Sequence, residues 1–139
     1  MSKAKKKKPE TKEVTFDLVR QLALELPGVA EGTSYGTPAF RAGGRTLARF
    51  HQDGESLVLK VEYAAREVLM GKHPETFYVT DHYRCYPLML VRLANVELPL
   101  LQTLIEDAWR SLASKRDIAT REGQPQRQPL ESVSKIIEV

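Results

Sequence analysis

Residues 34–61 read SYGTPAFRAGGRTLARFHQDGESLVLKV, and this stretch decides the fold class. It contains three short runs of strand-forming residues, at 40–42, 45–50 and 57–61. Gly43-Gly44 separates the first two runs, and Gln52-Asp53-Gly54 separates the second from the third. Turn-forming residues between β-prone runs predict two successive β-hairpins.

Three amphipathic segments flank these strands. The first follows Thr15, a favoured N-cap residue, and is predicted to end before Pro27-Gly28. The second covers 63–70 and is predicted to close at Gly71. The third begins near Pro99, where the missing N–H of a first-turn proline is harmless, and can continue past Lys115. These segments predict three helices.

Two more β-prone runs, at 77–80 and 88–93, lie between the second and third helices. The order helix, three strands, helix, two strands, helix predicts an α+β fold, in which a mostly antiparallel sheet packs its helices on one face. We expect a single domain over 13–122. Residues 1–12 are predicted to be a disordered lysine-rich tail, and 123–139 a polar linker with a short apolar end.

The net charge of +3 is unevenly distributed along the chain. Residues 1–12 hold six lysines and one glutamate, so the other 127 residues carry 15 basic and 17 acidic side chains, a net of −2. The lysine tail would bind polyanions without sequence preference. A nucleic-acid surface on the domain itself must therefore be a local patch.

One face of the predicted sheet collects cations. Its basic positions are Arg41, Arg45, Arg49, Lys60 and Arg92, and their strand neighbours form the predicted buried set: Phe40, Ala48, Phe50, Leu59, Val61, Val91 and Leu93. The same alternate strand positions also carry four apolar residues: Leu47, Val58, Leu88 and Leu90. A mixed apolar and basic face fits a protein partner or a second copy of the chain as well as nucleic acid.

The aromatic residues can be interpreted either as packing residues or as contacts to nucleic acid. In the loop 83–87, a tyrosine beside Arg84 is the combination that stacks on single-stranded nucleic acid, although tyrosines around a proline also pack loops onto sheets. Tyr35 and Phe40 are predicted mainly to pack around a turn. Trp109 lies beside the apolar stripe of the third helix and is predicted to close the core.

No residue pattern in the chain predicts catalysis. The candidates are Ser34, His51, His73, Asp81, His82 and Cys85, and their spacing matches no nucleophile–base motif, zinc site or phosphate-binding loop. We therefore expect a protein that is not an enzyme and holds no cofactor or metal. The single cysteine indicates a reducing cytoplasm, and neither a membrane-spanning stretch nor a secretory leader is expected.

Several runs together resemble one family of small bacterial proteins. These are residues 26–29 (LPGV), 34–40 (SYGTPAF), 57–61 (LVLKV), 82–83 (HY), 86–87 (YP) and 90–93 (LVRL), and they look like the MmcQ/YjbR family over roughly 15–115. The resemblance implies a YjbR-like, CyaY-like α+β fold and a DNA-binding role based on a double-wing arrangement of strands. Cys85 departs from the small residue expected at its position.

The leading hypothesis is a non-enzymatic DNA-binding protein without specific base reading. Its predicted phosphate contacts are Arg41, Arg45, Arg49, Lys60, Arg84 and Arg92, with Lys5, Lys6, Lys7 and Lys8 of the tail. The alternative is a protein-interaction or homodimerising module that uses the open sheet face or the C-terminal segment. The net −2 of the chain after residue 12 favours this alternative.

Overall fold

A computed structural model of the chain describes residues 14–123, which form one six-stranded antiparallel sheet and four α-helices. In chain order the elements are α1 (Phe16–Leu24), β1 (Ala30–Ser34), β2 (Thr37–Ala42), β3 (Arg45–Phe50), β4 (Ser56–Lys60), α2 (Tyr63–Lys72), β5 (Phe77–Tyr78), the 3₁₀ helix η1 (Asp81–Tyr83), β6 (Leu88–Arg92), α3 (Leu98–Leu112) and α4 (Lys115–Glu122). The strand order is β1-β2-β3-β4-β6-β5. The predicted α+β class is confirmed.

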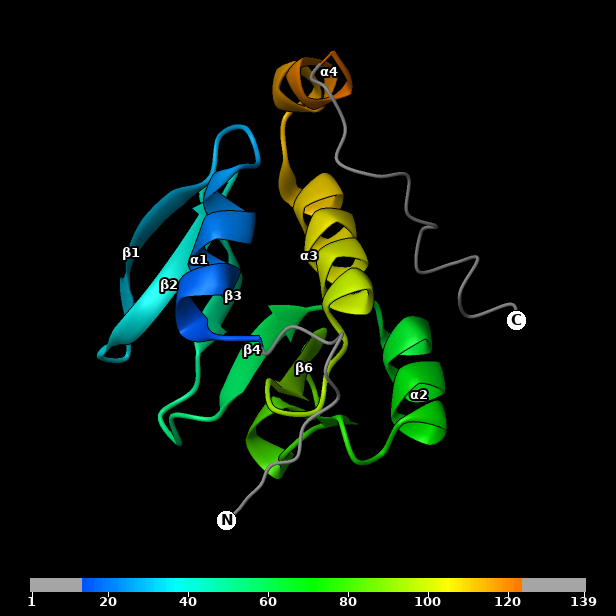
Figure 1. Cartoon of the computed structure of the whole chain (residues 1–139). Helices are drawn as coiled ribbons and strands as arrows, with labels where there is room; N and C mark the ends of the chain where they lie inside the picture. The colour runs from blue at the N-terminus through cyan, green and yellow to red at the C-terminus, as the bar shows by residue number, and fades with distance from the viewer. Residues whose placement is uncertain (1–13, 124–139) are drawn as a thin grey trace.

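The main core lies between the sheet and the helices on one of its faces (Figure 1). α3 packs on β3 and β4, and α2 packs on β5 and β6. Trp109 of α3 is fully buried, as predicted, and its indole N–H donates to the carbonyl oxygen of Pro27 at 2.8 Å. The whole predicted buried set lies in this core. Burial of each large apolar side chain contributes about 1.5–3 kcal/mol.

A β-bulge in β3 changes which side chains share a face. Phe40 pairs with Ala48, but the next pair is Arg41 with Thr46, so Leu47 is the extra residue. Leu47 is fully buried in the helix-side core, which corrects the expectation that it lies on the open face. At the bulge two residues of β3 oppose one residue of β2. The alternation of β3 side chains between the two faces of the sheet is therefore shifted by one residue there.

The helix boundaries follow local capping chemistry. The Thr15 hydroxyl accepts the Leu18 N–H at 3.1 Å, which is the predicted N-cap of α1. α2 differs from the prediction because it continues through Gly71 and ends at Lys72. The structure also has three elements that were not predicted: the edge strand β1, whose residues are mostly exposed and lack apolar alternation, the short 3₁₀ helix η1, and the separate helix α4.

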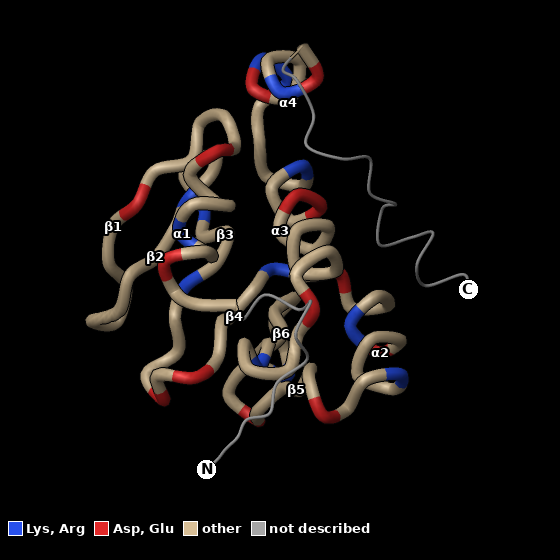
Figure 2. Tube along the Cα trace, viewed as in Figure 1, with Lys and Arg blue, Asp and Glu red and all other residues tan. Residues whose placement is uncertain are grey.

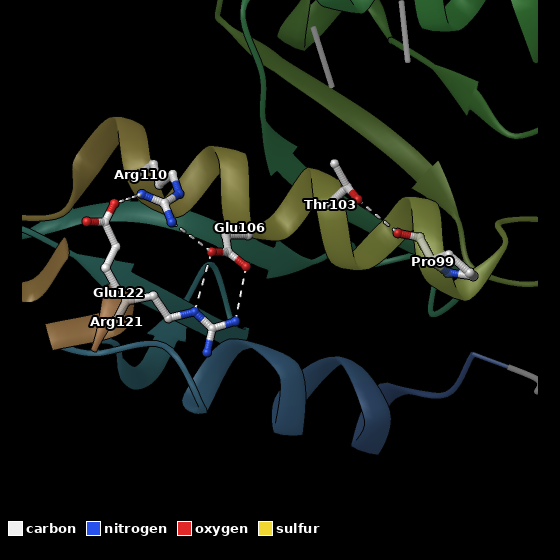
Figure 3. Close-up of polar contacts among 6 residues, drawn as sticks. All are labelled: Pro99, Thr103, Glu106, Arg110, Arg121 and Glu122. Atoms are coloured by element: carbon white, nitrogen blue, oxygen red, sulfur yellow. Dashed lines mark hydrogen bonds and ion pairs between the residues drawn. The ribbon is translucent and has the colours of Figure 1, made fainter. Parts of the chain in front are cut away.

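Helix α4 is joined to α3 by a network of ion pairs (Figure 3). The Arg121 guanidinium donates to both carboxylate oxygens of Glu106, at 3.1 and 3.4 Å. Arg110 lies 3.2 Å from Glu106 and 3.3 Å from Glu122. α4 buries none of its residues fully: Ile118 packs partly against the main core, and these ion pairs add to its attachment.

Two predicted segments lie almost wholly outside the described residues: the lysine-rich tail of 1–12, and the segment 123–139 apart from Gly123, the C-cap of α4. Within 14–123, no helix combines the length and the apolar character needed to span a membrane. All four α-helices carry both basic and acidic residues (Figure 2).

Candidate nucleic-acid interface

The sheet face opposite the helices is the candidate interface. We call it the strand face and define it by a row of cross-strand partners and their neighbours: Ala39, Arg49, Val58, Leu90 and Tyr78, with Arg41, Ser56, Lys60, Leu88 and Arg92 two residues away along the strands. Partners in an antiparallel ladder point to the same side of the sheet. The adjacent strand residues lie in the helix-side core.

Four of the predicted cations lie on the strand face, and three of them, Arg41, Lys60 and Arg92, reach solvent. Arg41 and Arg92 are exposed, and Lys60 is half-buried. The Arg92 guanidinium carbon lies 4.0 Å from the centre of the Tyr78 ring, and Arg41 donates weakly to the Thr46 hydroxyl at 3.4 Å. Within residues 14–123, no carboxylate forms an ion pair with any of these three cations.

Arg45 does not join this group. It pairs with Ala42, whose side chain lies in the helix-side core, so the bulge places Arg45 on the opposite side from Arg41 and Arg49. The glycine turn beside it is also tightly packed, since a Cβ on Gly43 would approach the Leu112 carbonyl oxygen to 2.4 Å. The expectation that the three hairpin arginines share one open face is therefore wrong for Arg45.

Arg49 lies on the strand face but is buried, with only 6% of its surface exposed. Its guanidinium donates to the Tyr83 hydroxyl and, at 3.4 Å, to the Phe50 carbonyl oxygen. The guanidinium also lies 5.0 Å from the ring centre of Tyr35. Burial lowers the pKa of Arg49 from its usual value, and the neighbouring Tyr35 partly opposes this shift. A phosphate reaches Arg49 only if its neighbours move.

The loop 79–87 covers part of the strand face, which makes that face less open than expected. Tyr83 packs with Val58 and Leu90 in a second, smaller core. The next residue, Arg84, is exposed and pairs with Asp81 at 3.1 Å. Tyr83 thus packs on the sheet, as one of the two interpretations of this loop expected. Tyr86 keeps 54% of its surface exposed.

Arg66 of α2 holds this loop in place, a role that sequence reasoning missed. It is 4% exposed, and its guanidinium donates to the carbonyl oxygens of Tyr86, Leu88 and Arg84 at 2.9, 3.1 and 3.0 Å. The Tyr63 hydroxyl adds a bond to the Cys85 carbonyl oxygen at 2.7 Å. The only available signal was a cation three residues before Leu69, on the buried side of its helix.

A polar cluster closes the end of the strand face at the β3–β4 turn. His51 Nδ1 lies 3.2 Å from Asp53, and the Ser56 hydroxyl lies 2.8 Å from the Tyr78 hydroxyl. Burial tends to raise the pKa of Asp53, but N–H donors from Glu55 and Ser56 and the His51 side chain outweigh it, so the pKa is lowered. This carboxylate acts as an acceptor that shapes the turn.

The residues weighed as catalytic candidates do not come together. His73 lies 3.9 Å from Glu75 at the end of α2, and the His82 ring stacks edge-on against Tyr83 at 4.7 Å between centres. Cys85 is an exposed free thiol. Within residues 14–123, no three histidine, cysteine or acidic side chains are placed to share a metal ion.

Fold and site together define a small α+β domain with helices on one sheet face and exposed cations on the other. The chain belongs to the YjbR family, whose model matches residues 24–111. This confirms the resemblance of the SYGTPAF run and the strands that follow it.

The individual relatives agree with this assignment. Uncharacterised proteins of Mycobacterium tuberculosis and Mycobacterium bovis are 40% identical to the chain over 48 residues, which are 34% of this chain and 37% of those proteins. The match thus spans little more than a third of these relatives. The crystal structure of Deinococcus radiodurans protein DR2400, described by the domain family DUF419, is similar with a TM-score of 0.65 and 25% identity. It covers 84% of this chain and 93% of that one.

Proposed function

We propose that this YjbR-family protein binds nucleic acid through the strand face. The carrying observation is that two exposed arginines of the strand face have no carboxylate partner among residues 14–123. Arg20 of α1 and Arg110 of α3 each contact two carboxylates, whereas Arg41 and Arg92 of the strand face contact none within 14–123. An exposed guanidinium without a carboxylate partner is free to bind phosphate.

Exposed aromatic rings at the edge of the strand face support the same proposal. Tyr35 keeps 76% of its surface exposed and lies beside Arg49. Tyr86 keeps 54% exposed and belongs to the loop whose Tyr83 covers Arg49. Cations interleaved with exposed aromatic rings are typical of nucleic-acid surfaces. The proposal changes the predicted contact set: Arg41, Lys60 and Arg92 contact phosphate directly, while Arg49 acts from beneath the surface.

Salt-dependent binding tests this function. The test protein is a variant of the full chain in which glutamine replaces Lys5, Lys6, Lys7 and Lys8, so that binding by the tail does not mask binding by the domain. In that background, Arg41→Glu with Arg92→Glu should weaken binding to a labelled oligonucleotide at least about tenfold, or about 1.4 kcal/mol. The slope of log affinity against log salt should fall by about 1.5–2, because two phosphate contacts are lost.

The matched control is Lys115→Glu with Arg116→Glu on α4. This pair is also exposed and changes the net charge by the same amount, but it does not lie on the strand face. The control should change the affinity less than threefold. Equal losses in the two double variants would contradict binding through the strand face and would indicate an effect of net charge alone.

A further inference from the structure

Tyr35 occupies a backbone conformation that a tyrosine rarely adopts. It has a φ of 55° and is followed by Gly36 with a φ of 79°, between the paired residues Ser34 and Thr37. Two successive positive φ values define a type I′ hairpin turn, where asparagine or glycine is favoured at the first central position. A bulky residue in this conformation suggests that its side chain has a role outside the turn.

The Tyr35 ring is supported from beneath and open above. The Arg49 guanidinium carbon lies 5.0 Å from its centre, and the same guanidinium lies 5.6 Å from the centre of the Tyr83 ring. The hydrogen bond to the Tyr83 hydroxyl holds the guanidinium in this position. Since 76% of Tyr35 is exposed, its outer surface is available to a second flat ring.

Arg49 is a buried cation without a carboxylate partner among residues 14–123. Buried charges are normally paired, because removing a charge from water is costly. Here two aromatic rings and two neutral oxygens take the place of a carboxylate. The positive charge therefore remains beneath Tyr35 and adds to the potential that attracts a phosphate chain.

We infer that Tyr35, supported by Arg49, is a stacking platform for an unpaired base, so that the strand face prefers single-stranded nucleic acid to duplex. This inference rests on the proposed function and names its substrate class. Bases in a duplex are stacked on each other, whereas a single strand can place a base on an aromatic side chain. Arg41, at the other end of β2, and Arg92, on β6, lie on the same sheet face and would contact phosphates further along the strand. Such stacking tolerates any base.

Two substitutions at Tyr35 separate the ring from the turn. Tyr35→Asn removes the ring but keeps a residue that favours the type I′ turn, so the fold is retained. Tyr35→Phe keeps the ring and removes the hydroxyl. The probes are a labelled 20-residue oligothymidylate and a labelled 20-base-pair duplex, each titrated by anisotropy with the full chain carrying the four tail lysine-to-glutamine changes.

The parent chain should bind the single strand at least about tenfold more tightly than the duplex. Tyr35→Asn should lose about tenfold for the single strand and less than threefold for the duplex, whereas Tyr35→Phe should stay within about threefold for both. Equal binding of the two probes, or a Tyr35→Asn chain that binds the single strand normally, overturns the stacking platform and leaves phosphate binding by Arg41 and Arg92 standing. Absence of binding to both probes at low salt overturns the proposed function itself.

Discussion

The guanidinium of Arg66 donates to the carbonyl oxygen of Tyr86 at 2.9 Å, and this contact links a helix of the main core to the loop on the strand face. The same side chain reaches the carbonyl oxygens on both sides of Cys85, those of Arg84 and Tyr86, and that of Leu88. The loop in turn holds Tyr83 against Arg49. The geometry of the candidate interface therefore depends on a buried arginine outside it.

Arg66→Leu should destabilise the protein by about 2–4 kcal/mol, because it leaves several carbonyl oxygens without a charged donor. Urea unfolding followed by circular dichroism measures the change. Arg20→Leu is the control, since it removes a partly exposed arginine with two ion pairs and should cost no more than about 1 kcal/mol. Similar costs for both variants would show that Arg66 does not organise the loop.

The glycine turn between β2 and β3 offers a matched pair of substitutions. Gly43 and Gly44 have φ values of 60° and 77°, so alanine is conformationally disfavoured at both, by roughly 1–2 kcal/mol. A Cβ at Gly43 would also meet the Leu112 carbonyl oxygen at 2.4 Å, whereas a Cβ at Gly44 meets open space. Gly43→Ala should therefore lower the melting temperature clearly more than Gly44→Ala does. Equal melting temperatures would contradict the packing of this turn against α3.

Asp53 should make stability depend on pH in a defined direction. Its pKa is lowered in the folded state, so its contribution is fully present above the usual carboxyl pKa and is lost as the pH falls through the lowered value. In Asp53→Asn the amide oxygen still accepts the N–H groups of Glu55 and Ser56, but the charge is gone. The difference in unfolding free energy between parent and variant should shrink between pH 6 and about pH 3. A difference independent of pH would contradict this assignment.

The ion pairs between α3 and α4 should control how tightly α4 is held. Glu106→Gln removes the shared carboxylate charge of Arg121 and Arg110, and it should speed amide exchange in α4 by about fivefold, or roughly 1 kcal/mol. Glu122→Gln touches only the outer Arg110 contact and should have a smaller effect. The experiment is hydrogen exchange by NMR. Unchanged exchange in Glu106→Gln would show that apolar contacts hold α4.

Local signals in the sequence predicted most of the fold. The N-cap at Thr15, the glycine turn at 43–44 and the alternation along 57–61 and 88–93 each act over a few residues, and the structure has the corresponding elements. The edge strand β1 was missed because most of its residues are exposed and carry no apolar alternation. α4 was missed because the apolar stripe of α3 gives no sign of the break at Ala113 and Ser114.

The interface was harder to predict because it depends on contacts between distant residues. The burial of Arg49 requires Tyr83, 34 residues further along the chain, and no local pattern connects the two. The bulge at Leu47 moves Arg45 to the other side, although alternation along β3 groups it with Arg49. Arg41, Lys60 and Arg92 were placed on one face correctly, since the strands that carry them, β2, β4 and β6, contain no extra residue.

The most direct test of the central claim is a map of amide chemical shifts on the ¹⁵N-labelled full chain, titrated with a 20-residue oligothymidylate at low salt. Binding through the strand face predicts that the largest shifts fall at 35–41, 49–51 and 82–92, with the amides of α1 and α4 nearly unchanged. The shifts should saturate and should reverse when salt is added. Shifts confined to the helices, or to the lysine-rich residues 1–12, would contradict the strand face as the nucleic-acid interface.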